Sequence, residues 1–93
     1  MPKFMIERHI PGAGKMSREQ LREVAAKSNA IVAGLGVPYT WHESFVAGDT
    51  IYCVHEADSA EIIYRHAREG GCPADKVTKV DAEFGPATAK AAG

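Results

Sequence analysis

The sequence predicts an α+β domain in which two helices cover one face of a four-stranded antiparallel sheet. Two stretches, 17–35 and 58–70, carry apolar residues at helical spacing, and glycines close each of them. Shorter stretches around these helices have the composition of strands, and the middle one has the pattern of a hairpin. The resulting order is strand, helix, two strands, helix, strand, which is the ferredoxin-like βαββαβ arrangement.

The first strand and the first helix are separated by a clear break. A strand is expected over residues 3–10, and the proline and glycines of residues 11–14 end it. The helix is expected to begin at Ser17, because Gln20 three residues later completes a capping box. Its predicted buried stripe consists of Leu21, Val24, Ala25, Ser28, Ile31, Val32 and Leu35.

The central part of the chain is predicted to be a β-hairpin with strands over residues 39–46 and 50–56. Gly48-Asp49 lies between them, and Gly-Asp is a favoured central pair of a tight turn because glycine adopts positive φ without steric strain. The turn would pair Ala47 with Thr50. This choice fixes the register, and a shift by one residue would move every side chain to the other face.

The second helix is expected to begin at Asp58, with Glu61 at its third position, and to stop where two glycines precede Pro73. His66 is expected to lie on its flank with the polar side outward. The predicted inner face of this helix carries Ile63, Ala67 and Gly70.

The last strand is expected over residues 76–84, where apolar and charged residues alternate. The strand order would then be 4-1-3-2, with both helices on one face. Residues 1–85 would form a single domain, and residues 86–93, rich in alanine, would form a flexible C-terminal tail.

The sheet face opposite the helices is expected to be covered by a second copy of the chain. With the predicted register, neither face of the hairpin is fully polar, although a solvated face should be. One face would carry Tyr39, Trp41, Phe45, Tyr52 and Val54, and the other His42, Ser44, Val46, Ile51, Cys53 and His55. A two-fold homodimer that packs sheet against sheet, or closes into a barrel, would bury the open face.

The same register predicts a metal site on the hairpin. Ser44 would face Cys53, and His42 would face His55. Directly opposed residues have Cβ atoms about 5 Å apart, which lets two imidazoles share one ion. Imidazole and thiolate ligands suit nickel, copper and zinc.

The first strand could complete this site. It would lie beside the third strand and parallel to it, so that His9 or Glu7 adds a donor to the ligands of the hairpin. The alternative interpretation is that the histidines belong to the surface or an interface, and that Cys53 is a small buried residue.

Composition excludes several classes of function. The net charge is −1 and no basic block is present, which argues against binding to nucleic acid or to a membrane surface. No apolar run is long enough for a transmembrane helix, and the N-terminus lacks the pattern of a signal peptide. We therefore expect a cytoplasmic protein, in which a disulfide between Cys53 and Cys72 is not favoured.

Several segments together resemble a family of small bacterial ferredoxin-like proteins of unknown function. They are residues 4–14, Trp41 with Ser44 and Val46, Asp49, residues 51–54, residues 66–67 and residues 70–73. This family includes a nickel-binding, nickel-responsive cytoplasmic protein. The resemblance implies a ferredoxin-like homodimer and a role in nickel binding.

The leading hypothesis is a cytoplasmic homodimer that sequesters or senses nickel, with copper and zinc as the other candidate ions. The predicted ligands are His42, His55 and Cys53, with His9 or Glu7 as a further donor. The alternative is a small dimeric enzyme of oxygenase or isomerase type. It would need a pocket beside the sheet, lined by Trp41, Tyr52 and His55, and it rests on fold analogy alone.

Overall fold

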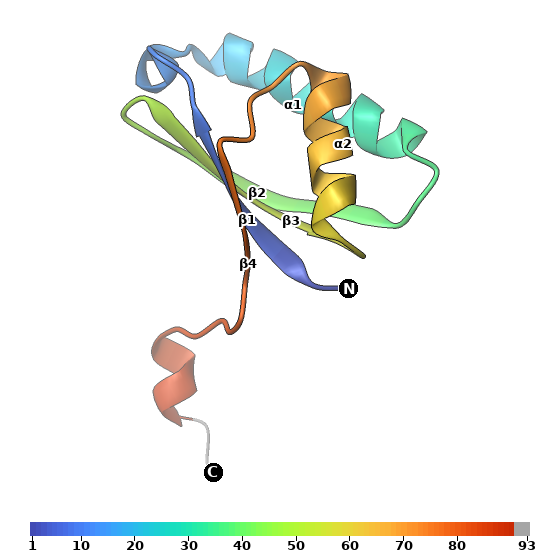
Figure 1. Cartoon of the computed structure of the whole chain (residues 1–93). Coiled ribbons are helices and arrows are strands. Elements are labelled where there is room, and N and C mark those ends of the chain that lie inside the picture. Colours follow the sequence, from blue (N-terminus) through green and yellow to red (C-terminus); the bar gives the residue numbers. More distant parts are fainter. Residues whose placement is uncertain (91–93) are drawn as a thin grey trace.

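The computed structural model describes residues 1–90 and confirms the predicted α+β, ferredoxin-like arrangement (Figure 1). Both helices lie on one face of an antiparallel sheet with the strand order β2-β3-β1-β4. The other face carries no helix in the described part of the chain. The elements are β1 (Lys3–His9), η1 (Ala13–Lys15), α1 (Arg18–Gly34), β2 (Tyr39–Ala47), β3 (Thr50–Ala57), α2 (Ala60–Gly70), β4 (Lys76–Lys79) and η2 (Pro86–Lys90), where η marks a 3₁₀ helix.

The direction of β1 differs from one expectation. β1 runs antiparallel to β3, with Lys3 opposite Glu56 and His9 opposite Thr50, so the predicted parallel alignment of the two strands is wrong. The reason is topological. The crossover through α1 makes β2 parallel to β1, and the hairpin then reverses the chain, so β3 must run antiparallel to β1.

Strand alternation divides β1 and β3 between the two faces. Phe4, Ile6 and Arg8 of β1 are buried toward the helices, and so are Ile51, Cys53, His55 and Ala57 of β3. The residues between them form the open face. These two sides of the sheet are the helical face and the open face.

The two helices contact the sheet to different degrees. α1 begins at Ser17 with the predicted capping box, because Ser17 accepts a hydrogen bond from the Gln20 amide and Gln20 accepts one from the Ser17 amide. No residue of α1 is fully buried, so its predicted stripe is only partly covered. α2 packs closely and buries Ile63, His66, Ala67 and Gly70. α1 therefore leaves space between itself and the sheet.

The ends of α2 and β4 differ from the sequence prediction. Ser59, and not Asp58, is the N-cap residue of α2. β4 ends at Lys79 because β1 begins at Lys3, and the Val80 amide makes the last bond, to the Lys3 carbonyl. Beyond that point no neighbouring strand among residues 1–90 offers ladder partners. The first part of the predicted tail forms η2, and residues 91–93 lie outside the described residues.

The hairpin turn forms as predicted and supports a neighbouring loop. Ala47 pairs with Thr50, and Gly48 has a φ of 63°, which glycine adopts readily. The Asp49 carboxylate accepts a hydrogen bond from the Gly12 amide. A Cβ at Gly14 would lie 2.9 Å from the Gly48 carbonyl oxygen, so the loop before α1 rests directly on the turn. None of the described helices has the length and apolar character needed to cross a membrane.

Candidate functional site

A bulge in β2 separates the two histidines that were predicted to face each other. Trp41 pairs with His55, but the next pair joins Glu43 to Val54, so His42 is an extra residue. A bulge of this kind shifts the register by one residue. Ser44 does face Cys53, as predicted, whereas the predicted pairing of His42 with His55 is wrong.

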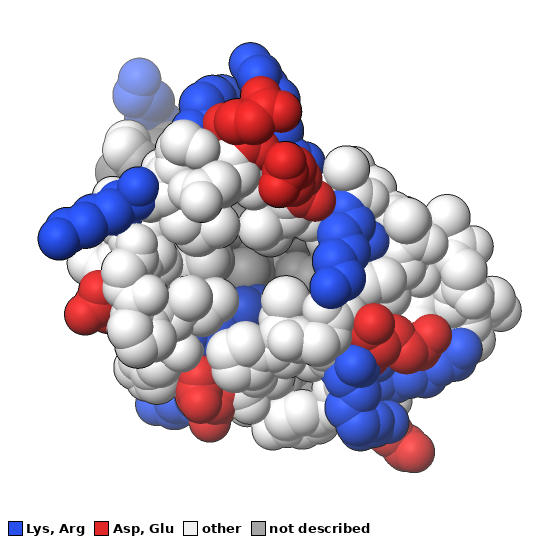
Figure 2. All heavy atoms as spheres, turned by 90° about the horizontal axis from the view of Figure 1, so that it is seen from above, with Lys and Arg blue, Asp and Glu red and all other residues white. Residues whose placement is uncertain are grey.

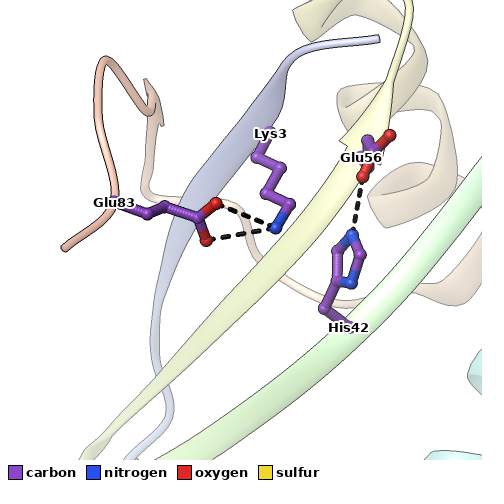
Figure 3. Close-up of polar contacts among 4 residues, drawn as sticks. All are labelled: Lys3, His42, Glu56 and Glu83. Atoms are coloured by element: carbon purple, nitrogen blue, oxygen red, sulfur yellow. Dashed lines mark hydrogen bonds and ion pairs between the residues drawn. The ribbon is translucent and has the colours of Figure 1, made fainter. Parts of the chain in front are cut away.

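His42 lies on the open face beside a carboxylate. Its Nε2 atom lies 2.8 Å from Glu56 Oε1 on the neighbouring strand, and Figure 3 shows the ring reaching from β2 toward β3. On the far side of β3, Lys3 pairs with Glu83 at 3.0 Å (Figure 3). His42 and Glu56 are both partly exposed, so they form a nitrogen and oxygen donor pair that is accessible from this face.

His55 lies on the helical face and is only 1% exposed. Its Nδ1 atom is hydrogen-bonded to the Tyr39 hydroxyl group. Cys53 is also buried on this face, where its Sγ atom accepts a hydrogen bond from Ser44 Oγ. The bulge moves Tyr39 and Trp41 to the same face as these residues, which reverses their predicted placement.

His66 of α2 joins this buried cluster, although the sequence analysis placed its polar side outward. It is 5% exposed, its ring stacks on Tyr39 with centroids 5.1 Å apart, and it packs edge-on against His55. Ser28 of α1 contacts its Nε2 atom at 3.1 Å. The spacing from Ile63 by three residues already indicated an inner-face position for His66.

Burial keeps the two imidazoles and the phenol of this cluster uncharged near neutral pH. Desolvation lowers the pKa of His55 from 6.5 to about 3, and the neighbouring His66 and the charge of Arg8 contribute in the same direction. Desolvation also lowers the pKa of His66, and Arg8 contributes to that shift. Desolvation raises the pKa of Tyr39. The cluster therefore presents neutral imidazoles and a protonated phenol.

The remaining predicted ligands lie at the other end of the open face. His9 pairs with Thr50 near the hairpin turn, and its Nδ1 atom lies 3.2 Å from Thr50 Oγ1. Glu7 lies 3.9 Å from the ammonium group of Lys76. His42 and Glu56 lie at the opposite end of the strands, where Glu56 faces Lys3.

The predicted ligands are therefore not one cluster. The open face carries His42, His9 and Glu7, and the helical face carries Cys53 and His55. Within residues 1–90, no group of three or more histidine, cysteine, aspartate and glutamate residues is close enough to hold a metal ion. One copy of the chain thus offers donor pairs but no complete nickel centre.

A pocket of about 600 Å³ lies on the helical side of the molecule. It is lined by residues of α1 and by Trp41 and His55, two of the three residues that the enzyme alternative placed beside a pocket. The third, Tyr52, lies on the open face opposite Phe45. Cys53 and Cys72 are both free thiols, and both line the pocket.

Comparison with known proteins gives two matches. The sequence profile of the family described as "Nickel responsive protein SCO4226-like" matches residues 4–80. The fold is similar to the crystal structure of SCO4226 from Streptomyces coelicolor A3(2), with a TM-score of 0.73 and 25% sequence identity. The similarity covers 88% of this chain and 99% of that one. Among curated proteins, none matches the chain.

Proposed function

Since this chain belongs to the family of nickel responsive, SCO4226-like proteins, we propose that it binds nickel in the cytoplasm and serves to sequester or sense the ion. Copper and zinc are the competing ions, because imidazole and carboxylate donors also suit them. The observation that carries this proposal is the position of the donors at the two ends of one open sheet face.

Two copies of the chain can complete a site that one copy leaves incomplete. In a two-fold dimer, if one residue of the first copy contacts a second residue of the partner, the second residue of the first copy also contacts the first residue of the partner. A two-fold axis across the strands would bring one end of the open face against the opposite end in the other copy. His42 and Glu56 of one copy would then meet His9 and Glu7 of the partner subunit.

The chemistry of this combined donor set suits nickel. Two imidazoles and two carboxylates provide the nitrogen and oxygen ligands that favour Ni²⁺ or Cu²⁺. The symmetry gives two equivalent sites in each dimer, or one ion for each chain. Cys53 and His55 are excluded from this ligand set, because the sheet backbone separates them from the open face.

The apolar centre of the open face supports the homodimer on which the site depends. Phe45 is 56% exposed and Met5 is 37% exposed. Tyr52 and Val54 lie beside them on the same face, because Phe45 pairs with Tyr52 and Met5 with Val54. Apolar groups gathered in this way, with polar residues at the rim, are typical of a contact surface.

Isothermal titration with Ni²⁺ on chelator-treated protein tests the function. We expect saturable binding tighter than about 100 μM, which corresponds to at least about 5 kcal/mol. His42→Ala should weaken it by about tenfold or more, because each lost ligand removes a direct metal bond. Cys53→Ser and His55→Gln are the matched controls and should bind nickel like the unchanged protein.

The outcome that contradicts the proposal is equally definite. Binding weaker than this limit, or an affinity that His42→Ala leaves unchanged, would exclude the open face as the nickel site. Loss of binding in the two control variants, with their folds intact by circular dichroism, would move the site to the helical face.

A further inference from the structure

The pocket on the helical side is large and mostly apolar. Its volume of about 600 Å³ lies within the range of small-molecule sites in proteins. Apolar residues such as Met16, Leu21 and Ile31 form much of its wall, and the indole of Trp41 adds to it. Figure 2, which views the helical side, shows a hollow among mostly uncharged atoms, with a basic side chain visible inside it.

The buried charge of this pocket belongs to Arg8. This residue of β1 lies on the helical face, lines the pocket and is only 4% exposed. Its Nη1 atom donates to the Pro73 carbonyl at 2.7 Å. Among residues 1–90, no carboxylate lies within ion-pair distance of its guanidinium group.

In the described part of the chain, the guanidinium group of Arg8 has neither a neutralising negative charge nor a full set of hydrogen-bond acceptors. It carries five N–H donors, and the one carbonyl bond leaves most of them without an acceptor among residues 1–90. Beside the larger effect of desolvation, the charge of Arg8 acts to lower the pKa of three nearby groups, Tyr39, His55 and His66, which are neutral near neutral pH and supply no negative charge. Burial of a cation without an anion is strongly unfavourable, so an anion that enters the pocket gains a strong electrostatic partner.

A second polar group of the pocket also lacks a partner. His66 Nδ1 is buried and has no hydrogen-bond partner in the described part of the chain, although Ser28 contacts the Nε2 atom of the same ring. If the Ser28 hydroxyl donates to Nε2, the neutral ring carries its proton on Nδ1. His66 lines the same pocket as Arg8, and its Nδ1 donor is buried behind that lining.

We propose that this pocket binds a small organic monocarboxylate with an apolar body. The planar fork of Arg8 matches the two oxygens of a carboxylate, and the wall around Trp41 covers the apolar body. Arg8 is the buried cation of the lining and balances one negative charge, while Arg18, Arg22 and Lys27 line the pocket as exposed residues. An inorganic phosphate has no apolar surface and fits this mostly apolar lining less well. The pocket and the open face lie on opposite sides of the sheet, so this inference does not depend on nickel binding.

Octanoate is a suitable probe, and Trp41 supplies the signal because it is the only tryptophan of the chain. We expect octanoate to change the Trp41 fluorescence saturably. Octan-1-ol has the same apolar body without the charge and should bind about tenfold more weakly or worse, which is the typical effect of one charge-assisted hydrogen-bonded pair. Inorganic phosphate should neither bind nor displace octanoate.

Two variants and one control locate the site. Arg8→Met removes the charge and should weaken octanoate binding about tenfold or more. Ala25→Trp fills the pocket from α1 and should abolish octanoate binding, as measured by isothermal titration, and this test stands even if Arg8→Met fails to fold. Arg65→Met removes an exposed arginine of α2 that pairs with Glu69, and it should bind octanoate like the unchanged protein.

Three results would overturn the proposal. The first is that the unchanged protein shows no saturable octanoate binding. The second is that both pocket variants bind octanoate as tightly as the unchanged protein does. The third is that phosphate binds as tightly as octanoate.

Discussion

Acidification from about pH 6.5 to about pH 4.5 is expected to lower the free energy of unfolding by about 2 kcal/mol through His55 alone. In the folded protein, burial lowers the pKa of His55 from 6.5 to about 3. Between these values the unfolded chain binds a proton that the folded chain does not. The stabilisation is therefore complete above pH 6.5 and is lost progressively as the pH falls toward 3. His66 adds to the effect in the same direction, because burial lowers its pKa too.

Urea unfolding at a series of pH values measures this effect. His55→Gln cannot titrate, so the slope of stability against pH should be smaller in this variant than in the unchanged protein. Equal slopes for the unchanged protein and His55→Gln would show that His55 is not held neutral by the fold.

Phe45→Asp is expected to separate the proposed homodimer. Phe45 is 56% exposed in a single copy, so the fold itself should tolerate the change. A charge at the centre of an apolar contact typically reduces the binding free energy by about 2 kcal/mol or more, which is a change of about 30-fold in the dissociation constant. Sedimentation equilibrium should therefore show a dimer for the unchanged protein and mostly monomer for the variant at micromolar concentration.

The same variant connects assembly to metal binding. Because each proposed site needs both copies, Phe45→Asp should lose nickel affinity although it retains every ligand. Tyr64→Asp provides the control, because Tyr64 is 41% exposed on α2, away from the open face. A monomeric Phe45→Asp that binds nickel as tightly as before would contradict a site shared between subunits.

Local sequence signals correctly predicted the start of α1, the hairpin turn and the strand pairing next to that turn. The capping box at Ser17 and the turn at Gly48 each depend on a few neighbouring residues, and both formed as expected. The pairing of Ser44 with Cys53 followed from the turn, since only a few residues separate it from that fixed point. Short-range chemistry of this kind can be read directly from a sequence.

The site was harder to predict because it depends on the strand register several residues away from the turn, where a single bulge changes every later pairing. The extra residue at His42 places Tyr39 and Trp41 on the sheet face opposite to the predicted one. It also places His42 on the other side of the sheet from His55. No glycine or other bulge signal marks this place in the sequence. The enzyme alternative named Trp41 and His55 as pocket residues, but the size of the pocket was hard to predict, since the apolar stripe of α1 does not reveal how far the helix lies from the sheet.

Mixing two defective variants gives the most direct test of the shared nickel site. One variant carries His42→Ala with Glu56→Ala, and the other carries Glu7→Ala with His9→Ala. Each alone should lose tight nickel binding, because both of its symmetric sites lack half of their ligands. After unfolding and joint refolding, each hybrid dimer should regain one intact site, and titration should detect it. If the mixture binds no more nickel than the separate variants, the ligands do not come from two copies in this arrangement, and the central claim is wrong.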